Sequence, residues 1–429
     1  MSVIVFIVIF VLFLMFLGIP VGVSFGLAGF IGLIMVRGFE AALSILGSVP
    51  YTWTSMEALT PLPLFILMGL FAFHSGISTE LFDTANKWLG RLPGGLAHAT
   101  TLACTGFAAC TGDSMAAAAA MGTVAYPSME KYGYSRRLST ACIAAGGTLG
   151  ILIPPSGPLI GYGFLTQTSI RDLFIAGMLP GLMLSSMFLI LIFIMCKINP
   201  KLGPRGESYS WKVRLLSLRG VWGMLLLFIL IIGGLYFGLF TPTEAGAIGA
   251  AGAFIIMIFK RRVTRPAMSE ALLSSARISC FFLTLIIGAM IFNTFLATSG
   301  AQTMLREWIL TLPVSRYVVL MGIVLLYYVC GWLMDAGAIM ILTIPIVGPI
   351  MAGLGFDLVW FGIITTVLLE VDLITPPVAL NLYVIQGVTK VPMGEIIRGV
   401  IPFVITMSIF LVLVIVFPQI SLFLPYLNK

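Results

Sequence analysis

Apolar runs long enough to cross a lipid bilayer recur along the whole chain, and they constrain its fold more than any other feature. Hydrophobic residue types make up 60% of the 429 residues, and charged residues make up only 9%. That balance lies far outside the range of soluble domains. A transmembrane β-barrel would alternate polar and apolar residues, which these runs do not do. The sequence therefore predicts an all-α, polytopic membrane protein.

The chain contains one structural unit used twice, in the manner of secondary transporters with inverted repeats. Asp113 lies 222 residues before Asp335, and Pro154-Pro155 lies 222 residues before Pro376-Pro377. The same shift relates Pro20 to Pro242, Pro127 to Pro349, Gly133 to Gly355, Gly177 to Gly399 and Pro180 to Pro402. A constant shift over so many positions makes chance agreement a poor explanation.

Each unit is predicted to cross the membrane an odd number of times, so the second unit is inserted upside down. The crossings of the first unit are 3–18, 21–36, 61–77, 138–167 and 174–196. In this scheme most basic residues lie on one side, which the positive-inside rule assigns to the cytoplasm. Of the 23 Lys and Arg residues, only five fall outside, namely Arg37, Arg171, Arg306, Arg316 and Lys429. The net charge of +7 is explained by these loops, and no nucleic-acid partner is expected.

These observations divide the chain into two repeats joined by a basic cytoplasmic linker at 197–220. The first repeat, 1–196, is predicted to contain scaffold helices (1–60), an interfacial arm (78–95), a re-entrant hairpin (98–128) and a broken helix (138–167). The second repeat, 221–429, is predicted to contain a scaffold (221–277), an arm (300–313), a re-entrant hairpin (318–350) and a broken helix (357–388). Each arm carries an apolar stripe at helical spacing, which favours a position in the membrane interface.

The paired prolines predict a helix that is interrupted at membrane depth in each repeat. Proline removes a backbone donor, and broken backbone at this depth is tolerated only where it lines protein or a water-filled cavity. Freed carbonyls suit a hard cation such as Na⁺, and half-helix N-termini suit an anionic group. A proline kink that only shapes packing is the alternative, and the matched pair of breaks argues against it.

The two aspartates lie at the centres of the predicted re-entrant hairpins. Asp113 occurs in "CTGFAACTGDSMAAAAAMGT", whose small residues allow close backbone contact. Asp335 occupies the matching place in "VCGWLMDAGAIMILTIP". An ionised carboxylate in mid-membrane costs about 2.5–3.5 kcal/mol on insertion scales. A cation bound at each tip explains the pair best, and a helix cap is an alternative that is compatible with ion binding.

Each tip is expected to form a Na⁺ site with the neighbouring helix break, so at least two Na⁺ ions and no organic cofactor are expected. The first site is predicted from Thr111, Asp113, Ser114, Gly147, Thr148 and Gly150. The second site is predicted from Asp335, Gly337, Asp372 and Thr375. Glu370 and Asp372 could each be a ligand, a proton carrier or the partner of a buried cation, and the sequence does not decide. Substrate is expected between the sites, near Ser156 and Asn381.

An enzyme is not expected. An intramembrane aspartyl protease needs two carboxyls that share a proton, whereas Asp113 and Asp335 enter from opposite sides with separate polar shells. A channel or a scaffold protein does not need duplicated re-entrant sites. The six cysteines lie in apolar segments without metal-ligand spacing, and no disulfide is predicted.

Five stretches of the chain resemble the large membrane subunit of tripartite ATP-independent periplasmic (TRAP) transporters, the DctM- or SiaM-like permease. They are "GRLPGGLAHAT", "GTLGILIPPSGPLIGYG", "LFIAGMLPG", "FGLFTPTEAGAIGA" and "ITPPVALNLYVI". The resemblance implies a Na⁺-driven, elevator-type importer of an organic acid of the sialic acid or C4-dicarboxylate type. It also implies a multi-pass protein among the lipids of the bacterial inner membrane. The implied partners are a small four-helix membrane subunit (Q-type) and a soluble periplasmic substrate-binding protein (P-type).

The chain departs from this family at two positions near the second break. The family often has Gly where this chain has Asp372, and often has Gly where it has Ala379. The chain begins directly on the first large-subunit span, so the small subunit is expected to be a separate polypeptide. A stand-alone Na⁺/divalent-anion symporter of similar fold, working without a binding protein, is the alternative function.

Overall fold

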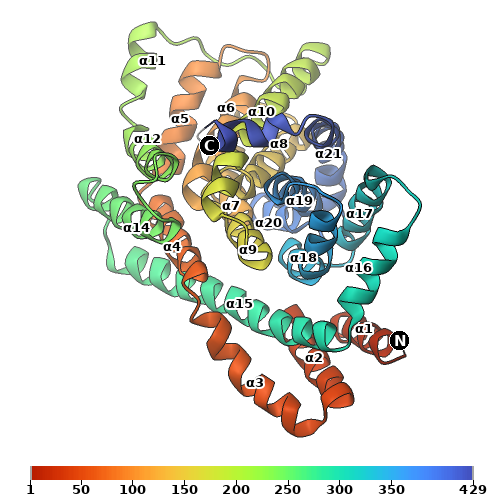
Figure 1. The fold of residues 1–429 in the computed structure, drawn as a ribbon. Coiled ribbons are helices and arrows are strands. Elements are labelled where there is room, and N and C mark those ends of the chain that lie inside the picture. Colours follow the sequence, from red (N-terminus) through yellow and green to blue (C-terminus); the bar gives the residue numbers. More distant parts are fainter. Residues whose placement is uncertain (1, 428–429) are drawn as a thin grey trace.

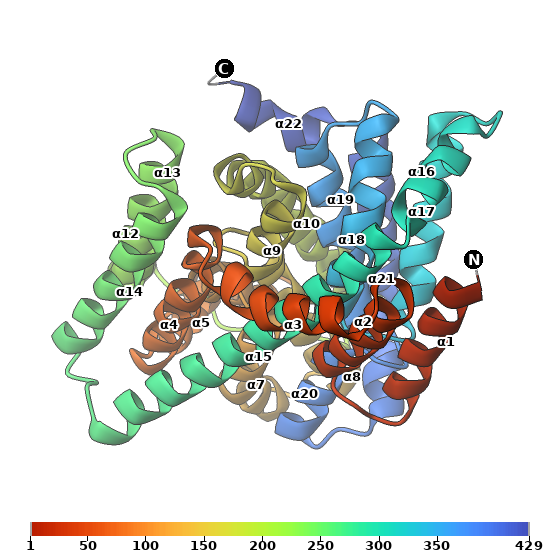
Figure 2. The ribbon, with the colours of Figure 1, turned by 60° about the horizontal axis from the view of Figure 1, so that its bottom comes forward.

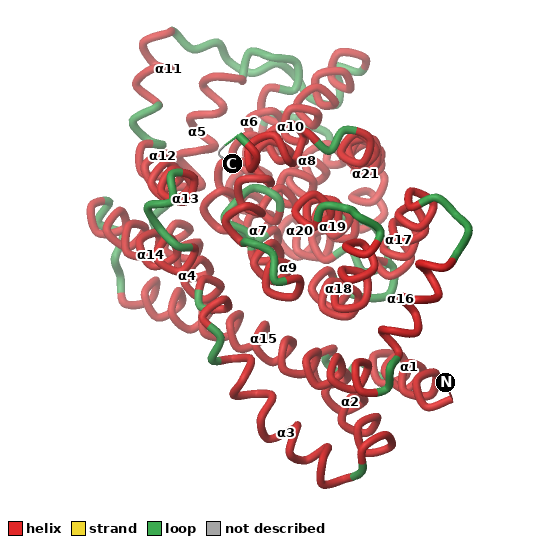
Figure 3. Tube along the Cα trace, in the orientation of Figure 1, coloured by secondary structure: helices red, strands yellow, loops and turns green. Residues whose placement is uncertain are grey.

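The computed structural model describes residues 2–427, which form helices and connecting loops without any strand (Figure 1, Figure 3). The N-terminal half contains α1 (Ser2–Phe16), α2 (Val21–Arg37), α3 (Phe39–Thr54), the 3₁₀ turn η1 (Glu57–Leu59), α4 (Pro61–His74), α5 (Ile77–Leu89), α6 (Gly95–Thr111), α7 (Ser114–Lys131), α8 (Arg136–Thr148), the 3₁₀ turn η2 (Leu149–Ile151), α9 (Gly157–Thr166) and α10 (Ile170–Ile198).

The linker carries the short helix α11 (Trp211–Ser217). The C-terminal half contains α12 (Trp222–Phe228), the π-helical turn η3 (Ile229–Gly233), α13 (Gly234–Tyr236), α14 (Pro242–Phe259), α15 (Arg265–Thr298), α16 (Ala301–Thr311), α17 (Arg316–Gly331), α18 (Ala336–Gly353), α19 (Leu358–Leu373), α20 (Leu380–Thr389), α21 (Met393–Val416) and α22 (Gln419–Tyr426).

Six helical segments of the described chain are long and apolar enough to cross a membrane. They are Glu57–His74, Ile170–Ile198, Pro242–Phe259, Arg265–Thr298, Ala336–Gly353 and Met393–Val416. The bent pair Trp211–Ser217 and Trp222–Tyr236 brings the number to seven if it forms one span. The predicted membrane class is confirmed. Which end of each unit faces the cytoplasm stays a prediction from the basic residues.

The two halves repeat the same elements in the same order. Helices α7 and α18 have 18 residues each, and both begin directly after an aspartate. Helices α9 and α20 have 10 residues each and follow the two Pro-Pro bonds, both of which are cis. They are followed by Gln167 and Lys390, whose φ angles of +56° and +59° are unusual for residues other than glycine. The predicted architecture of paired hairpins and broken helices is therefore present in the structure.

An outer layer, defined here as α1–α4 and α12–α15, joins the two halves, because helices of the first half pack against helices of the second. Helix α2 packs along α15, and α4 packs along α14, so each half contacts the other (Figure 1, Figure 2). Glycines bring the backbones together, because small residues permit close helix approach. A side-chain carbon added at Gly29 would lie 2.6 Å from the backbone nitrogen of Phe292, and one added at Gly22 would lie 2.8 Å from Cα of Leu285.

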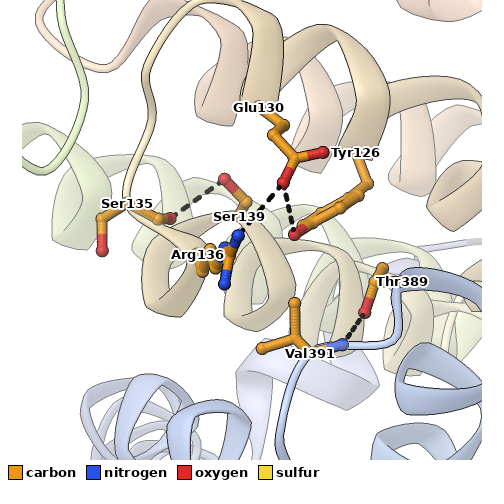
Figure 4. Close-up of polar contacts among 7 residues, drawn as sticks. All are labelled: Tyr126, Glu130, Ser135, Arg136, Ser139, Thr389 and Val391. Carbon is orange, nitrogen blue, oxygen red and sulfur yellow. Dashed lines mark hydrogen bonds and ion pairs between the residues drawn. The ribbon is translucent and has the colours of Figure 1, made fainter.

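An inner body, defined here as α6–α10 and α17–α21, contains both hairpins and both broken helices. The broken helix of each half packs on the hairpin of the other half, α9 on α18 and α20 on α7. Figure 4 shows one end of this body, where Glu130 of α7 pairs with Arg136 of α8 at 3.7 Å and accepts a hydrogen bond from Tyr126 at 3.5 Å. Thr389, the last residue of α20, and Val391 in the loop that follows lie beside them.

The two predicted arms differ in their surroundings. Helix α5 buries Leu81, Phe82 and Ala85, and it packs along α6. Its Trp88 donates a ring N–H hydrogen bond to the carbonyl of Arg214 in the linker, at 3.1 Å. Helix α16 buries none of its side chains. The apolar stripe of the first arm therefore serves packing within the protein, and the orientation of either arm in a membrane stays a prediction.

Replacing Ala379 with Gly is expected to stabilise the protein. Ala379 precedes α20 with a φ of +29°, a region that is strained for residues with a Cβ. Relief of this strain exceeds the added entropy of glycine in the unfolded chain, so a gain of about 0.5–1 kcal/mol is expected. Thermal unfolding in detergent should show a small rise in melting temperature. The control Ala251→Gly, on the exposed face of α14, should lower it, and an equal fall in both variants would contradict the assignment of strain.

Candidate functional site

The first hairpin turns within two residues, between α6 and α7. Gly112 adopts a φ of +62°, which glycine tolerates without strain. Asp113 follows as the N-cap of α7, and its Oδ1 accepts hydrogen bonds from the backbone N–H groups of Met115 at 2.8 Å and Ala116 at 3.3 Å. The predicted capping role is therefore present at the tip.

The first broken helix packs directly onto this tip. A side-chain carbon added at Gly150 would lie 3.0 Å from the carbonyl oxygen of Asp113, and one added at Gly147 would lie 3.2 Å from the carbonyl oxygen of Ser114. The backbone N–H of Gly157 donates to the carbonyl of Gly112 at 3.5 Å. The tip and the break therefore contact each other through their backbones, and the absence of a side chain at Gly147 and Gly150 makes this contact possible.

The residues predicted for the first site differ in where they lie relative to this contact. Asp113, Ser114, Gly147 and Gly150 come together at this contact. Thr111 lies at the end of α6 beside the tip, where its hydroxyl donates to the carbonyl of Phe107 at 3.2 Å and lies 3.5 Å from the carbonyl oxygen of Asp113. Thr148 is buried, and its hydroxyl donates to the carbonyl of Ala145 at 2.8 Å within α8.

Sequence reasoning missed Gly69 of α4 as a neighbour of this tip. A side-chain carbon added at Gly69 would lie 2.8 Å from Cα of Thr111, so the outer layer touches the tip of the inner body. A glycine inside an apolar helix was the available signal, but it does not reveal its partner.

The second hairpin repeats the cap with different surroundings. Oδ1 of Asp335 accepts hydrogen bonds from the N–H groups of Gly337 at 3.0 Å and Ala338 at 3.2 Å, at the start of α18. Thr375, after α19, donates its hydroxyl to the carbonyl of Val371 at 2.7 Å. Asp372 lies between these elements, against Gly331 at the end of α17. The predicted second-site residues are therefore neighbours of one tip and one break.

The last turn of α19 carries two buried carboxylates. Glu370 is fully buried, and neither of its carboxylate oxygens has a hydrogen-bond partner. Asp372 is 6% exposed, and its Oδ1 has no partner. The two residues are two positions apart on a helix, so their side chains leave it in nearly opposite directions. Within residues 2–427 no Lys, Arg or His forms an ion pair with either carboxylate.

Asn381 connects the two halves at the first tip. It is fully buried, and its amide nitrogen donates to Oγ of Ser114 at 2.7 Å and to the carbonyl of Ala144 at 3.3 Å. Its amide oxygen has no partner. Ser156 is also buried; it caps α9 by accepting from the N–H of Leu159 at 3.3 Å, and its hydroxyl donates to the carbonyl of Ile151. A substrate contact by Ser156 or Asn381 stays a prediction.

Chemically, this region has more acceptors than donors. The unpartnered oxygens of Glu370, Asp372 and Asn381 are buried, whereas the capping side chains of Asp113 and Asp335 are half-buried. A buried acceptor without a partner is costly. Carboxylate, amide and carbonyl oxygens are the ligands of hard cations, so the arrangement is suited to bind cations rather than to perform covalent chemistry.

Gly150→Ala is expected to separate the first tip from its broken helix, because the new Cβ meets the backbone of Asp113 and no flexible side chain can yield. Hydrogen–deuterium exchange should be faster at residues 111–116 than in the unsubstituted chain. The matched control is Gly387→Ala in α20, where a Cβ meets nothing within 4 Å. Unchanged exchange at the tip in Gly150→Ala would contradict the close contact.

Comparisons with known proteins agree with this geometry. A family model described as "Tripartite ATP-independent periplasmic transporter, DctM component" matches residues 7–420. The C4-dicarboxylate TRAP transporter large permease protein DctM of Pseudomonas aeruginosa is 36% identical over 401 residues, which cover 90% of this chain and 93% of that protein. The sialic acid TRAP transporter large permease protein SiaM of Vibrio cholerae is 32% identical, with 96% of each chain covered.

Among solved structures, the YdaH transporter of Alcanivorax borkumensis, described as having an unusual topology, superposes with a TM-score of 0.59 at 17% identity. The match covers 88% of both chains and shows a shared fold. The family match extends over nearly the whole chain and includes both tips and both breaks. The chain therefore belongs to the DctM component family of TRAP transporters, and it is a multi-pass protein of the bacterial inner membrane.

Proposed function

We propose that this permease is a Na⁺-coupled secondary active importer of an organic acid, supplied with substrate by a periplasmic binding protein. The observation that carries the proposal is the set of buried, unpartnered oxygens on α19 and α20, the helices on either side of the second break, together with the two Asp-capped hairpin tips. Each tip adjoins a helix that is broken by two prolines. Cations at these tips would satisfy the acceptors and would couple ion binding to the position of the hairpins.

Na⁺ is the favoured cation because each candidate site is made of hard oxygen ligands. Neither site contains a histidine or a thiolate among the residues assigned to it, as a transition metal would prefer. One Na⁺ that moves down a membrane potential of 100 mV supplies about 2.3 kcal/mol. Two Na⁺ ions that move with a singly charged acid carry a net charge of +1, so the potential supplies about 2.3 kcal/mol, enough for a substrate gradient of about fiftyfold, and the Na⁺ gradient adds to this.

The division into two layers supports a proposal for the mode of movement. The outer layer is held together by glycine contacts between α2 and α15. The inner body contains both tips and both breaks, linked by Asn381 and Ser114. We infer that the inner body moves as a unit relative to the outer layer and carries ions and substrate across, in an elevator motion.

The family description supports the proposed partners and substrate class. A tripartite, periplasmic system implies two further components, for which we propose a small four-helix membrane subunit and a soluble substrate-binding protein. The relatives described above carry the names of C4-dicarboxylate and sialic acid transporters, and both kinds of compound bear carboxylates. The proposed substrate is therefore an organic acid with at least one carboxylate.

Asp113→Asn and Asp335→Asn are each expected to abolish Na⁺-driven uptake in proteoliposomes while the protein still folds. Asparagine keeps the helix cap and removes only the charge. The control is Asp357→Asn, because Asp357 caps α19 in the same way, through the N–H groups of Val359 at 2.7 Å and Trp360 at 3.1 Å, but lies away from both tips. Normal Na⁺-driven uptake by Asp113→Asn and Asp335→Asn would rule out the tip carboxylates as ion ligands.

Uptake is also expected to depend on the binding protein. Proteoliposomes that contain this chain and the small subunit should import a radiolabelled C4-dicarboxylate or sialic acid only when Na⁺ and the cognate binding protein are both outside. A stand-alone symporter of the same fold would import the acid without the binding protein. Robust uptake in its absence would replace the tripartite proposal with that alternative.

A further inference from the structure

The two candidate cation sites differ at one equivalent position. Gly150 of the first broken helix corresponds to Asp372 of the second, 222 residues later. At the first site there is no space for a side chain here, because a carbon added at Gly150 would lie 3.0 Å from the carbonyl carbon and oxygen of Asp113 and 3.2 Å from the nitrogen of Ser114. The first site is therefore restricted to the single carboxylate of Asp113.

At the second site the glycine that leaves space lies on α17, the helix packed against Asp372. Gly331 ends α17, where the first half has Ala109 at the equivalent position. A carbon added at Gly331 would lie 2.8 Å from Oδ1 of Asp372 and 3.2 Å from its Cγ. Helix α17 thus leaves room for the carboxylate of Asp372. The pair Ala109 and Gly150 in one half is replaced by Gly331 and Asp372 in the other.

The carboxylate of Asp372 is buried and has an incomplete set of partners. Asp372 is 6% exposed, and its Oδ1 accepts no hydrogen bond. Gly331, against which it packs, lies four residues before Asp335, so Asp335 and Asp372 both lie near the end of α17 at the second tip. No basic side chain of the described chain forms an ion pair with Asp335 or Asp372. A buried carboxylate without a positively charged partner is costly, and a bound cation would satisfy it.

We propose that the second site is a dicarboxylate site that accepts Ca²⁺ in competition with Na⁺, whereas the first site accepts monovalent cations only. Two carboxylates and nearby backbone carbonyls are hard oxygen ligands. Ca²⁺ takes six to eight of these at about 2.3–2.6 Å in flexible geometry, whereas Mg²⁺ demands a near-ideal octahedron and retains its water. A divalent cation also neutralises both charges at once. The competition with Na⁺ rests on the proposed function, and the binding of Ca²⁺ does not.

The first experiment measures Ca²⁺ binding without transport. The purified full chain in detergent, free of Na⁺, is titrated with CaCl₂ while its melting temperature is recorded. Ca²⁺ should raise the melting temperature, MgCl₂ should do so more weakly, and added NaCl should shift the Ca²⁺ titration to higher concentration. A chain that shows no response to CaCl₂ would overturn the proposal.

Three variants locate the site. Asp372→Asn should weaken the apparent Ca²⁺ affinity about tenfold or more, because the charge of the ligand set tunes calcium affinity. Gly331→Ala should act in the same direction by displacing the carboxylate without removing it, and it decides the matter if Asp372→Asn does not fold. Glu307→Gln removes an exposed carboxylate on α16 and should titrate like the unsubstituted chain. Equal Ca²⁺ affinity in Asp372→Asn and the unsubstituted chain would overturn the assignment.

The second experiment separates this inference from the proposed function. In proteoliposomes with the partner subunits, Ca²⁺ on the substrate side should inhibit Na⁺-driven uptake, and higher Na⁺ should relieve the inhibition. Gly331→Ala should be less sensitive to Ca²⁺. A complete lack of Na⁺-driven uptake would refute the proposed function and leave the Ca²⁺ titrations to decide the second site. Na⁺-driven uptake that is insensitive to Ca²⁺ would refute the competition alone.

Discussion

Backbone groups and carboxylates in the middle of a lipid bilayer must find partners within the protein, and the rest of this structure depends on that constraint. Both helix breaks occur where another segment meets them. The N–H of Gly157 reaches the carbonyl of Gly112 on the first tip, and Asp113 and Asp335 satisfy the first N–H groups of α7 and α18. The buried carboxylate and amide oxygens left without a partner on α19 and α20 are acceptors, and the proposed cation would satisfy them.

The same constraint explains the distribution of glycine. Close backbone contact is needed at two kinds of place, between the helices of the outer layer and between each tip and its surroundings. Gly22 and Gly29 bring α2 against α15, and Gly147 and Gly150 bring α8 and η2 against the first tip. The first contact joins the halves into a frame, and the second defines a candidate ion site. Both use the absence of a Cβ to replace side-chain packing with backbone contact.

Duplication gives the two candidate sites the same cap, and local substitution makes them different. Both aspartates accept two backbone N–H groups through Oδ1. The first tip is enclosed by glycine backbone, whereas near the second tip the carboxylate of Asp372 packs against Gly331, four residues before Asp335. The arms diverge as well, since α5 packs into the protein and α16 does not. The repeated architecture therefore contains two candidate sites with different numbers of carboxyl groups.

The sequence by itself determined the membrane class, the duplication, the two tips and the two breaks. These features depend on hydropathy, on proline chemistry and on a constant spacing, all of which are local or periodic signals. It did not reveal the hydrogen bond between Asn381 and Ser114, the contact of Gly69 with Thr111, or the packing of Asp372 against Gly331.

Only the tertiary structure decided these contacts, because they join segments that no periodic pattern relates. The packing of α5 on α6, and the link from Trp88 to Arg214 across 126 positions, show the same limit. An amphipathic stripe on α5 and on α16 predicts that each will cover an apolar surface. Whether that surface is lipid or another helix depends on where the rest of the chain lies, and that is fixed by packing rather than by the stripe.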